Sequence, residues 1–332
     1  MFPVFVPLCV VLLVLLLLGF DYARDRGWFA SHYSIAGELV VITGAGGGLG
    51  RELALHCAKR GAVLALWDVR QEALVEVVAW LETHGVARGC IHERVVDVSD
   101  AAAVERAGKA QSASLGPARI VIINAAVVTG ARILDANEAQ LVNAIGVNLL
   151  AHVWCVRTFL PQMIAPPRPH GTIVTLGSLM AAIPAAGLAD YCASKAAIAQ
   201  LHECLRWELG SLGAAAAGNV HLMHVQPYLI DTPLFAGGQP LRYAWLRALL
   251  PPLQATSVAR RIIDGVQTRR EHLVLPWVLK WLPSLLAMLP VLLRDTALDL
   301  AGAGCAMDTF TGRGPQRKGG RRSRSPRAAK RH

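Results

Sequence analysis

The stretch Leu39-Val40-Val41-Ile42-Thr43-Gly44-Ala45-Gly46-Gly47-Gly48-Leu49-Gly50 decides the fold. Its first four residues are apolar and predict a buried strand, and a helical pattern follows the glycines as far as Gly61. In the order strand, glycine turn, helix, such glycines let backbone N–H groups approach a pyrophosphate at the positive end of the helix dipole. The stretch therefore predicts a dinucleotide site. The residues expected to contact the cofactor are Thr43, Gly44, Gly46, Gly48, Leu49 and Gly50.

Asp68 ends the second predicted strand, residues 62–67. An acid at this position accepts hydrogen bonds from the adenosine ribose hydroxyls and repels a 2′-phosphate. Arg70 follows closely and softens that discrimination. We therefore expect NAD(H) in preference to NADP(H), and NADP(H) stays open as the alternative.

Strands and helices alternate along most of the chain. After residue 70 the pattern predicts strands at 91–96, 121–124, 172–178 and 220–226, and helices at 71–84, 138–163 and 191–212. Repeated β-α units imply a single α/β domain with a Rossmann-type, doubly wound parallel sheet. Ligands of such sheets bind at the carboxyl ends of the strands. These residues lie at predicted strand ends: Gly44, Asp68, Asp97, Asn124 and Ser178.

The segment Tyr191-Cys192-Ala193-Ser194-Lys195 places a phenol and an amine four residues apart on one helix face. A phenol with an ordinary pKa of about 10 exchanges protons poorly at neutral pH. A neighbouring ammonium group favours the phenolate and is expected to lower the pKa of Tyr191. The pair is a candidate acid/base unit, and the alternative for the spacing alone is a solvated helix face.

The net charge of +10 is concentrated at the carboxyl end. Nine Arg and Lys residues and no acid follow Gly312, which leaves +1 for the rest of the chain. A nearly neutral body gives no reason to expect nucleic acid as a partner. Residues 313–332 are rich in Arg, Ser, Gly and Pro and are expected to be a disordered tail.

The seven cysteines are scattered and form no C-x-x-C pair, which favours reduced thiols on the cytosolic side. His221 and His224 lie three apart in a predicted strand and would point to opposite faces. We therefore expect no metal site.

Residues 1–20 contain no charged side chain and are long enough to span a bilayer as a helix. No basic residue precedes the apolar run, and no clean small-x-small cleavage site follows it. These features favour an uncleaved membrane anchor at 1–22 over a cleaved signal peptide. A linker at 23–36 would join the anchor to a catalytic domain at 37–272.

Taken together, these motifs resemble the short-chain dehydrogenase/reductase family from about Gly37 to Pro276. The matching residues are the glycine turn, the Asn124-Ala125 turn, Asn148, Ser178, and Tyr191 with Lys195. Ser178 and Tyr191 are thirteen residues apart, which is the usual separation in that family.

The resemblance implies a catalytic tetrad of Asn148, Ser178, Tyr191 and Lys195. Tyr191 would exchange the alcohol proton while Ser178 hydrogen-bonds the substrate oxygen. Lys195 would depress the pKa of Tyr191 and hold the nicotinamide ribose, and Asn148 would anchor a water relay. The resemblance also implies further cofactor contacts from these residues: Asp97, Val98, Asn124, Ala125, Tyr191, Lys195 and Thr232.

Two segments depart from the common family pattern. The usual N-N-A-G reads Ile123-Asn124-Ala125-Ala126, and the usual P-G after the sixth strand reads Pro227-Tyr228. An alanine strains such a turn only if its φ must be positive. The first variant resembles that of membrane-bound retinaldehyde reductases, and the second resembles that of retinol dehydrogenases. Motifs in the C-terminal half, such as Leu275-Pro276-Trp277, resemble the retinoid- and steroid-active membrane branch of the family, which includes the 17β-hydroxysteroid dehydrogenase type 11-like group.

That branch implies a retinoid substrate, most simply all-trans-retinol or retinal, with a steroid or other lipid alcohol as the alternative. It also implies residence in the endoplasmic reticulum membrane or on lipid droplets, contact with membrane lipid, and homo- or hetero-dimers within the family. The catalytic domain is expected to face the cytosol. The alternative of another class is a non-catalytic, membrane-anchored scaffold.

The segment 273–312 is apolar but interrupted by Pro276, Pro283 and Pro290. Three prolines oppose a regular spanning helix. We expect this segment to lie at the membrane surface and beside the substrate. Residues 235–253 are also apolar and are expected to cover the nicotinamide, with ordinary core packing as the alternative.

Overall fold

The structure, a computed structural model, describes residues 16, 19–23, 32–165, 170–213, 218–238 and 241–312. Leu16 and residues 19–23 are helical. The predicted anchor at 1–22 otherwise lies outside the described residues, as do most of the linker and the whole basic tail at 313–332.

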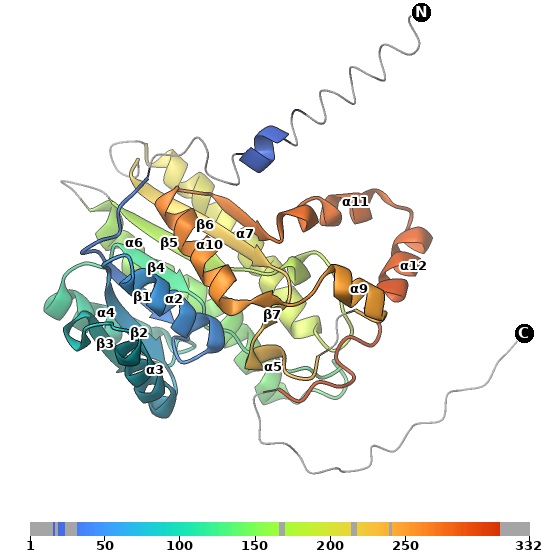
Figure 1. Cartoon of the computed structure of the whole chain (residues 1–332), viewed down its shortest axis with the longest axis horizontal. Helices are drawn as coiled ribbons and strands as arrows, with labels where there is room; N and C mark the ends of the chain where they lie inside the picture. Colours follow the sequence, from blue (N-terminus) through green and yellow to red (C-terminus); the bar gives the residue numbers. More distant parts are fainter. Residues whose placement is uncertain are drawn as a thin grey trace, which may run out of the picture.

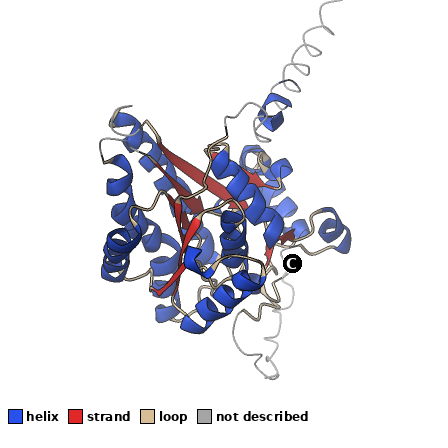
Figure 2. Ribbon diagram, turned by 60° about the vertical axis from the view of Figure 1, so that its left-hand side comes forward, coloured by secondary structure: helices blue, strands red, loops and turns tan. Residues whose placement is uncertain are grey.

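Seven parallel strands form the central sheet, in the order β3-β2-β1-β4-β5-β6-β9 (Figures 1 and 2). The strands are β1 (Leu39–Thr43), β2 (Val63–Asp68), β3 (Ile91–Val95), β4 (Ile120–Ile123), β5 (Gly171–Leu176), β6 (Val220–Pro227) and β9 (His272–Leu275). This order reverses between β1 and β4, which is the point where ligands bind in doubly wound sheets. The predicted Rossmann-type fold is confirmed.

Helices cover both faces of the sheet (Figure 2). One layer holds α2 (Gly48–Ala58), α3 (Gln71–Thr83) and α10 (Ala255–Gln267), and the other holds α4 (Ala101–Leu115), α6 (Ala151–Ile164) and α7 (Ala189–Ser211). Val40 and Ile42 of β1 belong to the first core, and Leu39 and Val41 belong to the second. Because both faces are covered, β1 is apolar almost throughout.

The predicted helix at 138–163 is interrupted at its centre. It consists of α5 (Glu138–Ile145), a π-helical turn at Gly146–Leu150, and α6. Within the described residues, Glu138–Ile164 is the one helical stretch long and apolar enough to cross a membrane. Cys155, Phe159 and Met163 of this stretch are buried in the second core, so it is part of the domain.

Short elements surround the carboxyl ends of the strands. They are β7 (Ile230–Asp231) paired with β8 (Leu253–Gln254), then α9 (Ala244–Leu249), α11 (Leu282–Met288) and α12 (Val291–Ala301). The predicted boundary between 272 and 273 falls inside β9, whose residues pair with β6. Leu273 to Leu275 therefore complete the sheet, and the apolar segment beyond the sheet begins at the cis Leu275–Pro276 bond.

Candidate active site

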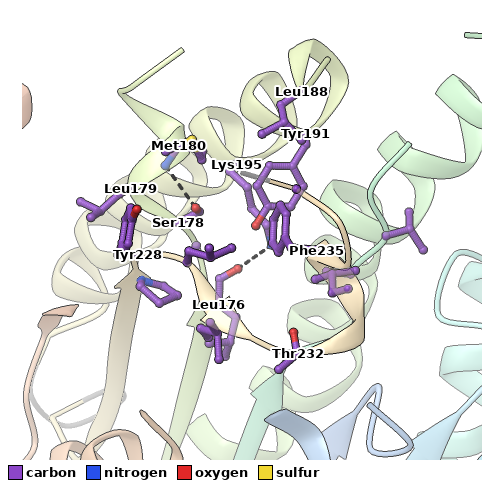
Figure 3. Close-up of a pocket in the computed structure, with 18 of the residues that line it drawn as sticks. Leu176, Ser178, Leu179, Met180, Leu188, Tyr191, Lys195, Tyr228, Thr232 and Phe235 are labelled. Atoms are coloured by element: carbon purple, nitrogen blue, oxygen red, sulfur yellow. Dashed lines mark hydrogen bonds between the residues drawn. The ribbon is translucent and has the colours of Figure 1, made fainter. Parts of the chain in front are cut away.

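A cavity of about 470 Å³ opens at the carboxyl ends of the strands (Figure 3). Thirteen of the predicted site residues line it: Gly44, Gly48, Leu49, Gly50, Asp68, Asp97, Val98, Asn124, Ala125, Ser178, Tyr191, Lys195 and Thr232. Thr43, Gly46 and Asn148 lie outside the lining and support it from behind. The volume is typical of a small-molecule site.

The glycine turn leaves room for a ligand at the start of α2. The N-cap, Gly47, gives no side-chain cap, so the first N–H groups of the helix have no partner of that kind. Gly44 has a φ of +65°, and a Cβ on it would lie 2.8 Å from the Ala125 Cα. A Cβ on Gly50 would lie 2.2 Å from the Gly44 carbonyl oxygen. This close backbone packing at a helix N-terminus fits a pyrophosphate.

Thr43 and Asn124 join the glycine turn to the end of β4. The buried Thr43 hydroxyl accepts hydrogen bonds from the backbone N–H groups of Asn124 at 3.0 Å and Ala125 at 3.1 Å. The Asn124 amide donates to the Thr43 and Gly44 carbonyls at 3.0 and 3.1 Å. Thr43 therefore sets the shape of the site from outside the cavity.

Asp68 presents a buried carboxylate at the end of β2. It accepts hydrogen bonds from the backbone N–H groups of Gly46 and Arg70, both at 3.0 Å. The Arg70 guanidinium is half-exposed, with its Nε 3.5 Å from Asp68 Oδ1. The acid predicted to meet the ribose is thus present, with a cation beside it. The exposed Asp97 carboxylate instead accepts from the Ser99 N–H and hydroxyl at 2.9 and 2.7 Å.

Tyr191 and Lys195 project from α7 toward the loop that carries Ser178 (Figure 3). Lys195 Nζ donates a hydrogen bond to the Leu176 carbonyl at 2.7 Å and lies 5.6 Å from the centre of the Tyr191 ring. The Ser178 hydroxyl accepts from the Met180 N–H at 3.1 Å. Hydroxyl, phenol and amine therefore meet at one wall of the cavity, and the solvated-face alternative for Tyr191 and Lys195 is wrong.

The expected direction of the Tyr191 pKa is also wrong for this structure. Burial raises the pKa of Tyr191, and the hydrogen bond with Ser178 opposes this effect. Burial also lowers the pKa of Lys195 to about 7. Both groups are almost completely buried, and removal from water disfavours the charged form of each. Desolvation is therefore the largest effect on the pKa of each group.

Asn148 lies in the π-helical turn, directly behind the site. Its Oδ1 accepts a hydrogen bond from the Val127 N–H at 2.9 Å, and its Nδ2 donates to the Val127 carbonyl at 3.0 Å. The side chain thus holds the segment that leaves β4 against α5 and α6. The predicted water relay at Asn148 stays a prediction.

The other half of the cavity is apolar and comes mainly from the carboxyl end of the chain. Phe235 meets Tyr191 edge-on, with ring centres 5.5 Å apart. For this half of the cavity the sequence predicted only two apolar segments, 235–253 and 273–312. The structure supplies these: Leu279, Leu282, Leu286, Leu298, Ala301, Ala306 and Met307. The apolar composition of 273–312 was the available signal.

Ala126 and Tyr228, which depart from the common pattern, are accommodated without backbone strain. Within the described ranges Arg269 is the one non-glycine residue with a positive φ. The Tyr228 N–H donates to the Leu275 carbonyl at 2.7 Å, and its ring packs with Leu179 and Leu279. Both replacements therefore fit an intact site.

Comparisons with known proteins agree with this geometry. The short chain dehydrogenase family matches residues 38–240. The mouse epidermal retinol dehydrogenase 2 is 36% identical over 84% of this chain and 87% of its own length. The human 17-beta-hydroxysteroid dehydrogenase 13 is 31% identical over 80% of this chain and 85% of its own length. A short-chain dehydrogenase/reductase from Burkholderia phymatum, solved in complex with NAD, has a TM-score of 0.66 at 25% identity, covering 80% of this chain and 96% of that one.

Proposed function

Because this chain belongs to the short-chain dehydrogenase family and is an NAD(P)-dependent oxidoreductase of CH–OH groups, we propose that it interconverts a lipophilic alcohol and its carbonyl at a membrane. The substrate proposed is all-trans-retinol or retinal. The observation that carries this proposal is the apolar half of the cavity, which adjoins Tyr191 and Ser178.

The residues present fit a nicotinamide cofactor, which supplies hydride transfer when bound. The glycine turn at the start of α2 would hold its pyrophosphate, and Asp68 would hold the adenosine ribose. The Thr232 methyl packs over the turn, since a Cβ on Gly48 would lie 3.0 Å from Thr232 Cγ2. This position beside the glycine turn supports the predicted cofactor contact of Thr232. The Asp68 carboxylate supports NAD(H) as the preferred form.

Tyr191 is proposed to exchange the proton of the substrate hydroxyl, and Ser178 to hydrogen-bond the substrate oxygen as charge develops on it. Lys195 serves this exchange because its pKa of about 7 lets it gain or lose a proton near neutral pH. Asn148 holds the segment behind the site through Val127.

An apolar substrate suits the remaining lining. Leu188, Phe235 and Met307 surround the Tyr191 ring, so a hydrocarbon chain would reach the reacting carbon without unpaired polar groups. The retinol dehydrogenase named above supports a retinoid. The hydroxysteroid dehydrogenase supports a steroid as the second candidate.

The surface around this half of the cavity supports membrane association. Large apolar side chains are exposed on α9, α11, α12 and the turn before α11: Trp245, Leu249, Val278, Trp281, Leu285, Met288, Leu292 and Leu293. We call this set the apolar rim. Such a large exposed apolar surface is typical of a membrane or protein contact.

The chain that follows the apolar stretch 1–20 meets the same region. Lys280 Nζ contacts the two Asp21 carboxylate oxygens at 2.5 and 2.7 Å, and Trp277 Nε1 donates to Asp21 at 3.3 Å. The Tyr22 and Trp277 rings lie 5.2 Å apart. An anchor at 1–22 would therefore enter the bilayer beside the apolar rim. We propose residence in the endoplasmic reticulum membrane or on lipid droplets, with the domain facing the cytosol.

The function is tested by turnover of membranes that contain the full chain, with all-trans-retinol, retinal and a 17β-hydroxysteroid as substrates. We expect the highest kcat/KM with the retinoid pair. Leu298→Glu, which places a charge in the apolar lining, should lower kcat/KM at least about tenfold. Leu212→Glu, an exposed site outside the cavity, should stay within about twofold of wild type. Cofactor binding without turnover of any substrate would support the scaffold alternative instead.

The cofactor preference is tested by binding. Asp68→Asn keeps the shape of the side chain and removes its charge, so the affinity ratio of NADH to NADPH should fall about tenfold. Glu72→Gln removes an exposed charge in the first turn of α3 and should leave the ratio unchanged. A wild-type preference for NADPH would contradict the role given to Asp68.

A further inference from the structure

We propose that His224 and His202, joined by the Thr175 hydroxyl, carry the reaction proton between Lys195 and the protein surface at His272. This inference rests on the proposed function, because it requires Tyr191 to exchange a proton with an alcohol. It adds a route on the sheet side of α7, separate from the predicted relay at Asn148.

The residues of this histidine chain come from four adjacent elements. Thr175 of β5 pairs in register with His224 of β6. His202 lies seven residues after Lys195, so both project from the buried face of α7, about two turns apart. His272 begins β9, the neighbour of β6. These polar side chains thus lie near one another between α7 and the sheet.

The centre of the chain is a completed pair of hydrogen bonds. Thr175 Oγ1 lies 3.0 Å from His224 Nδ1 and 3.1 Å from His202 Nδ1. All three side chains are at most 3% exposed. A hydroxyl accepts from one neighbour while it donates to another, so a proton can pass from one ring to the other through Thr175.

Both outer nitrogens of the pair lack a hydrogen-bond partner among the described residues. They are Nε2 of His224 and Nε2 of His202. A Cβ on Gly177, which lines the cavity, would lie 2.8 Å from His224 Nε2, so this nitrogen is adjacent to the cavity wall. Both ring nitrogens of His152, one turn after Asn148, are also buried without a partner. Buried polar atoms of this kind commonly bind internal water, which would link them to Lys195.

The other end of the chain reaches solvent. The His202 and His272 rings lie 5.8 Å apart. The His272 side chain is 39% exposed, and its Nε2 lies 3.3 Å from Glu203 Oε1. Glu203 also pairs with Arg206 at 3.1 Å. A proton that arrives at His272 therefore meets a partly exposed carboxylate and bulk water.

Burial keeps the rings of the chain neutral. Burial, with smaller contributions from His202, His272 and Lys195, lowers the pKa of His224 to about 3. Burial also lowers the pKa of His202 to about 4, with smaller contributions from His272, His221 and Arg206 and opposition from Glu203. A neutral imidazole accepts a proton at one nitrogen and releases one from the other.

In the proposed alcohol oxidation, for which a bound nicotinamide would be the hydride acceptor, Tyr191 takes the hydroxyl proton and releases its own phenol proton to the neutral amine of Lys195. That proton passes by way of Lys195 to Nε2 of His224, which releases its Nδ1 proton to Thr175 Oγ1. The Thr175 hydroxyl proton moves to Nδ1 of His202, and the Nε2 proton of His202 leaves toward His272. One proton reaches solvent for each alcohol oxidised, and no electrons move along the chain.

The test compares Thr175→Val, which removes the hydroxyl at nearly constant volume, with Thr175→Ser, which keeps it. Single turnovers of the full chain in membranes, with retinol and NAD, are followed by NADH absorbance and by a pH-indicator dye in weak buffer. In wild type and Thr175→Ser, proton release should accompany NADH formation. In Thr175→Val, proton release should lag at least about tenfold while NADH affinity stays close to wild type, and thermal stability should fall because two buried hydrogen bonds are lost.

Proton release at the wild-type rate from Thr175→Val would overturn the proposal. If this variant does not fold, His202→Gln provides the same comparison, since glutamine can hydrogen-bond but does not relay a proton. If wild type is active, Tyr191→Phe loses turnover, and Thr175→Val releases protons at the wild-type rate, the histidine chain alone is overturned. A wild type inactive on every alcohol would overturn the proposed function as well.

Discussion

Lys195 occupies a position where its charge is unfavourable. Its side chain is almost completely buried, and its Nζ donates a hydrogen bond to the Leu176 carbonyl. The family resemblance, including the separation of Ser178 from Tyr191 and of Tyr191 from Lys195, predicted that these three residues share a site. The direction of the Tyr191 pKa could not be predicted in the same way, because it depends on burial by residues distant in sequence, such as Phe235 and Met307.

The Lys195 pKa predicts a pH-dependent stability. It is about 7 in the fold against an ordinary value of 10.5, so between these values the unfolded chain binds a proton that the folded chain does not. Stability from this group therefore rises with pH through that window and is lowest below pH 7. Lys195→Met should be more stable than wild type at pH 7 and below, by on the order of 4 kcal/mol. The difference should shrink toward pH 10 in thermal unfolding of the detergent-solubilised full chain, and a pH-independent difference would contradict it.

At the scale of elements, the first strand, the glycine turn and the helix that follows it were predictable because their sequence pattern is local. Two other elements were not. β9 is a four-residue run next to an apolar segment, and its pairing with β6 is a long-range contact. The π-helical turn at Asn148 was not predictable from the periodicity of 138–163, since apolar residues occur throughout that stretch and define no single face.

The glycine turn gives a prediction about stability. Gly50→Ala places a Cβ 2.2 Å from the Gly44 carbonyl oxygen, so the turn must shift. We expect a loss of about 2–3 kcal/mol and weaker NADH binding, measured by thermal unfolding and fluorescence titration. Gly89→Ala is the matched control because no atom lies within 4 Å of its added Cβ, and its stability should change by less than about 1 kcal/mol. Equal stability of the two variants would show that the turn is not tightly packed.

The whole molecule combines a polar cofactor half with an apolar half that opens beside the apolar rim. The fold and the cofactor half of the cavity were predictable, because parallel topology brings strand ends together whatever the side chains. The residues of α11 and α12 that line the cavity were not, since the prolines at 276, 283 and 290 gave no direction for the helices between them. The structure places α11 and α12 so that Leu286 and Leu298 face the cavity while Met288 and Leu292 are exposed.

The apolar rim predicts that substrate reaches the site from the bilayer. The double variant Met288→Glu, Leu292→Glu should raise KM at least about fivefold for retinol presented in phospholipid vesicles, because charged side chains oppose insertion. It should leave turnover of retinol in detergent micelles within about twofold of wild type. The matched control is the double variant Val75→Glu, Val142→Glu, whose sites are exposed on α3 and α5. It should behave as wild type in vesicles and in micelles. Equal loss in vesicles and micelles would indicate a packing defect instead.

The proton exchange between Tyr191 and a lipophilic alcohol is the chemical step proposed for this site. Its most direct test is NADH formation by membranes containing full-length Tyr191→Phe, supplied with retinol and NAD and compared with wild type. The phenylalanine keeps the ring contact with Phe235 and removes only the hydroxyl. Turnover should fall at least about 10²-fold while NADH binds as in wild type. Turnover of retinol by Tyr191→Phe at the wild-type rate would contradict this proposal.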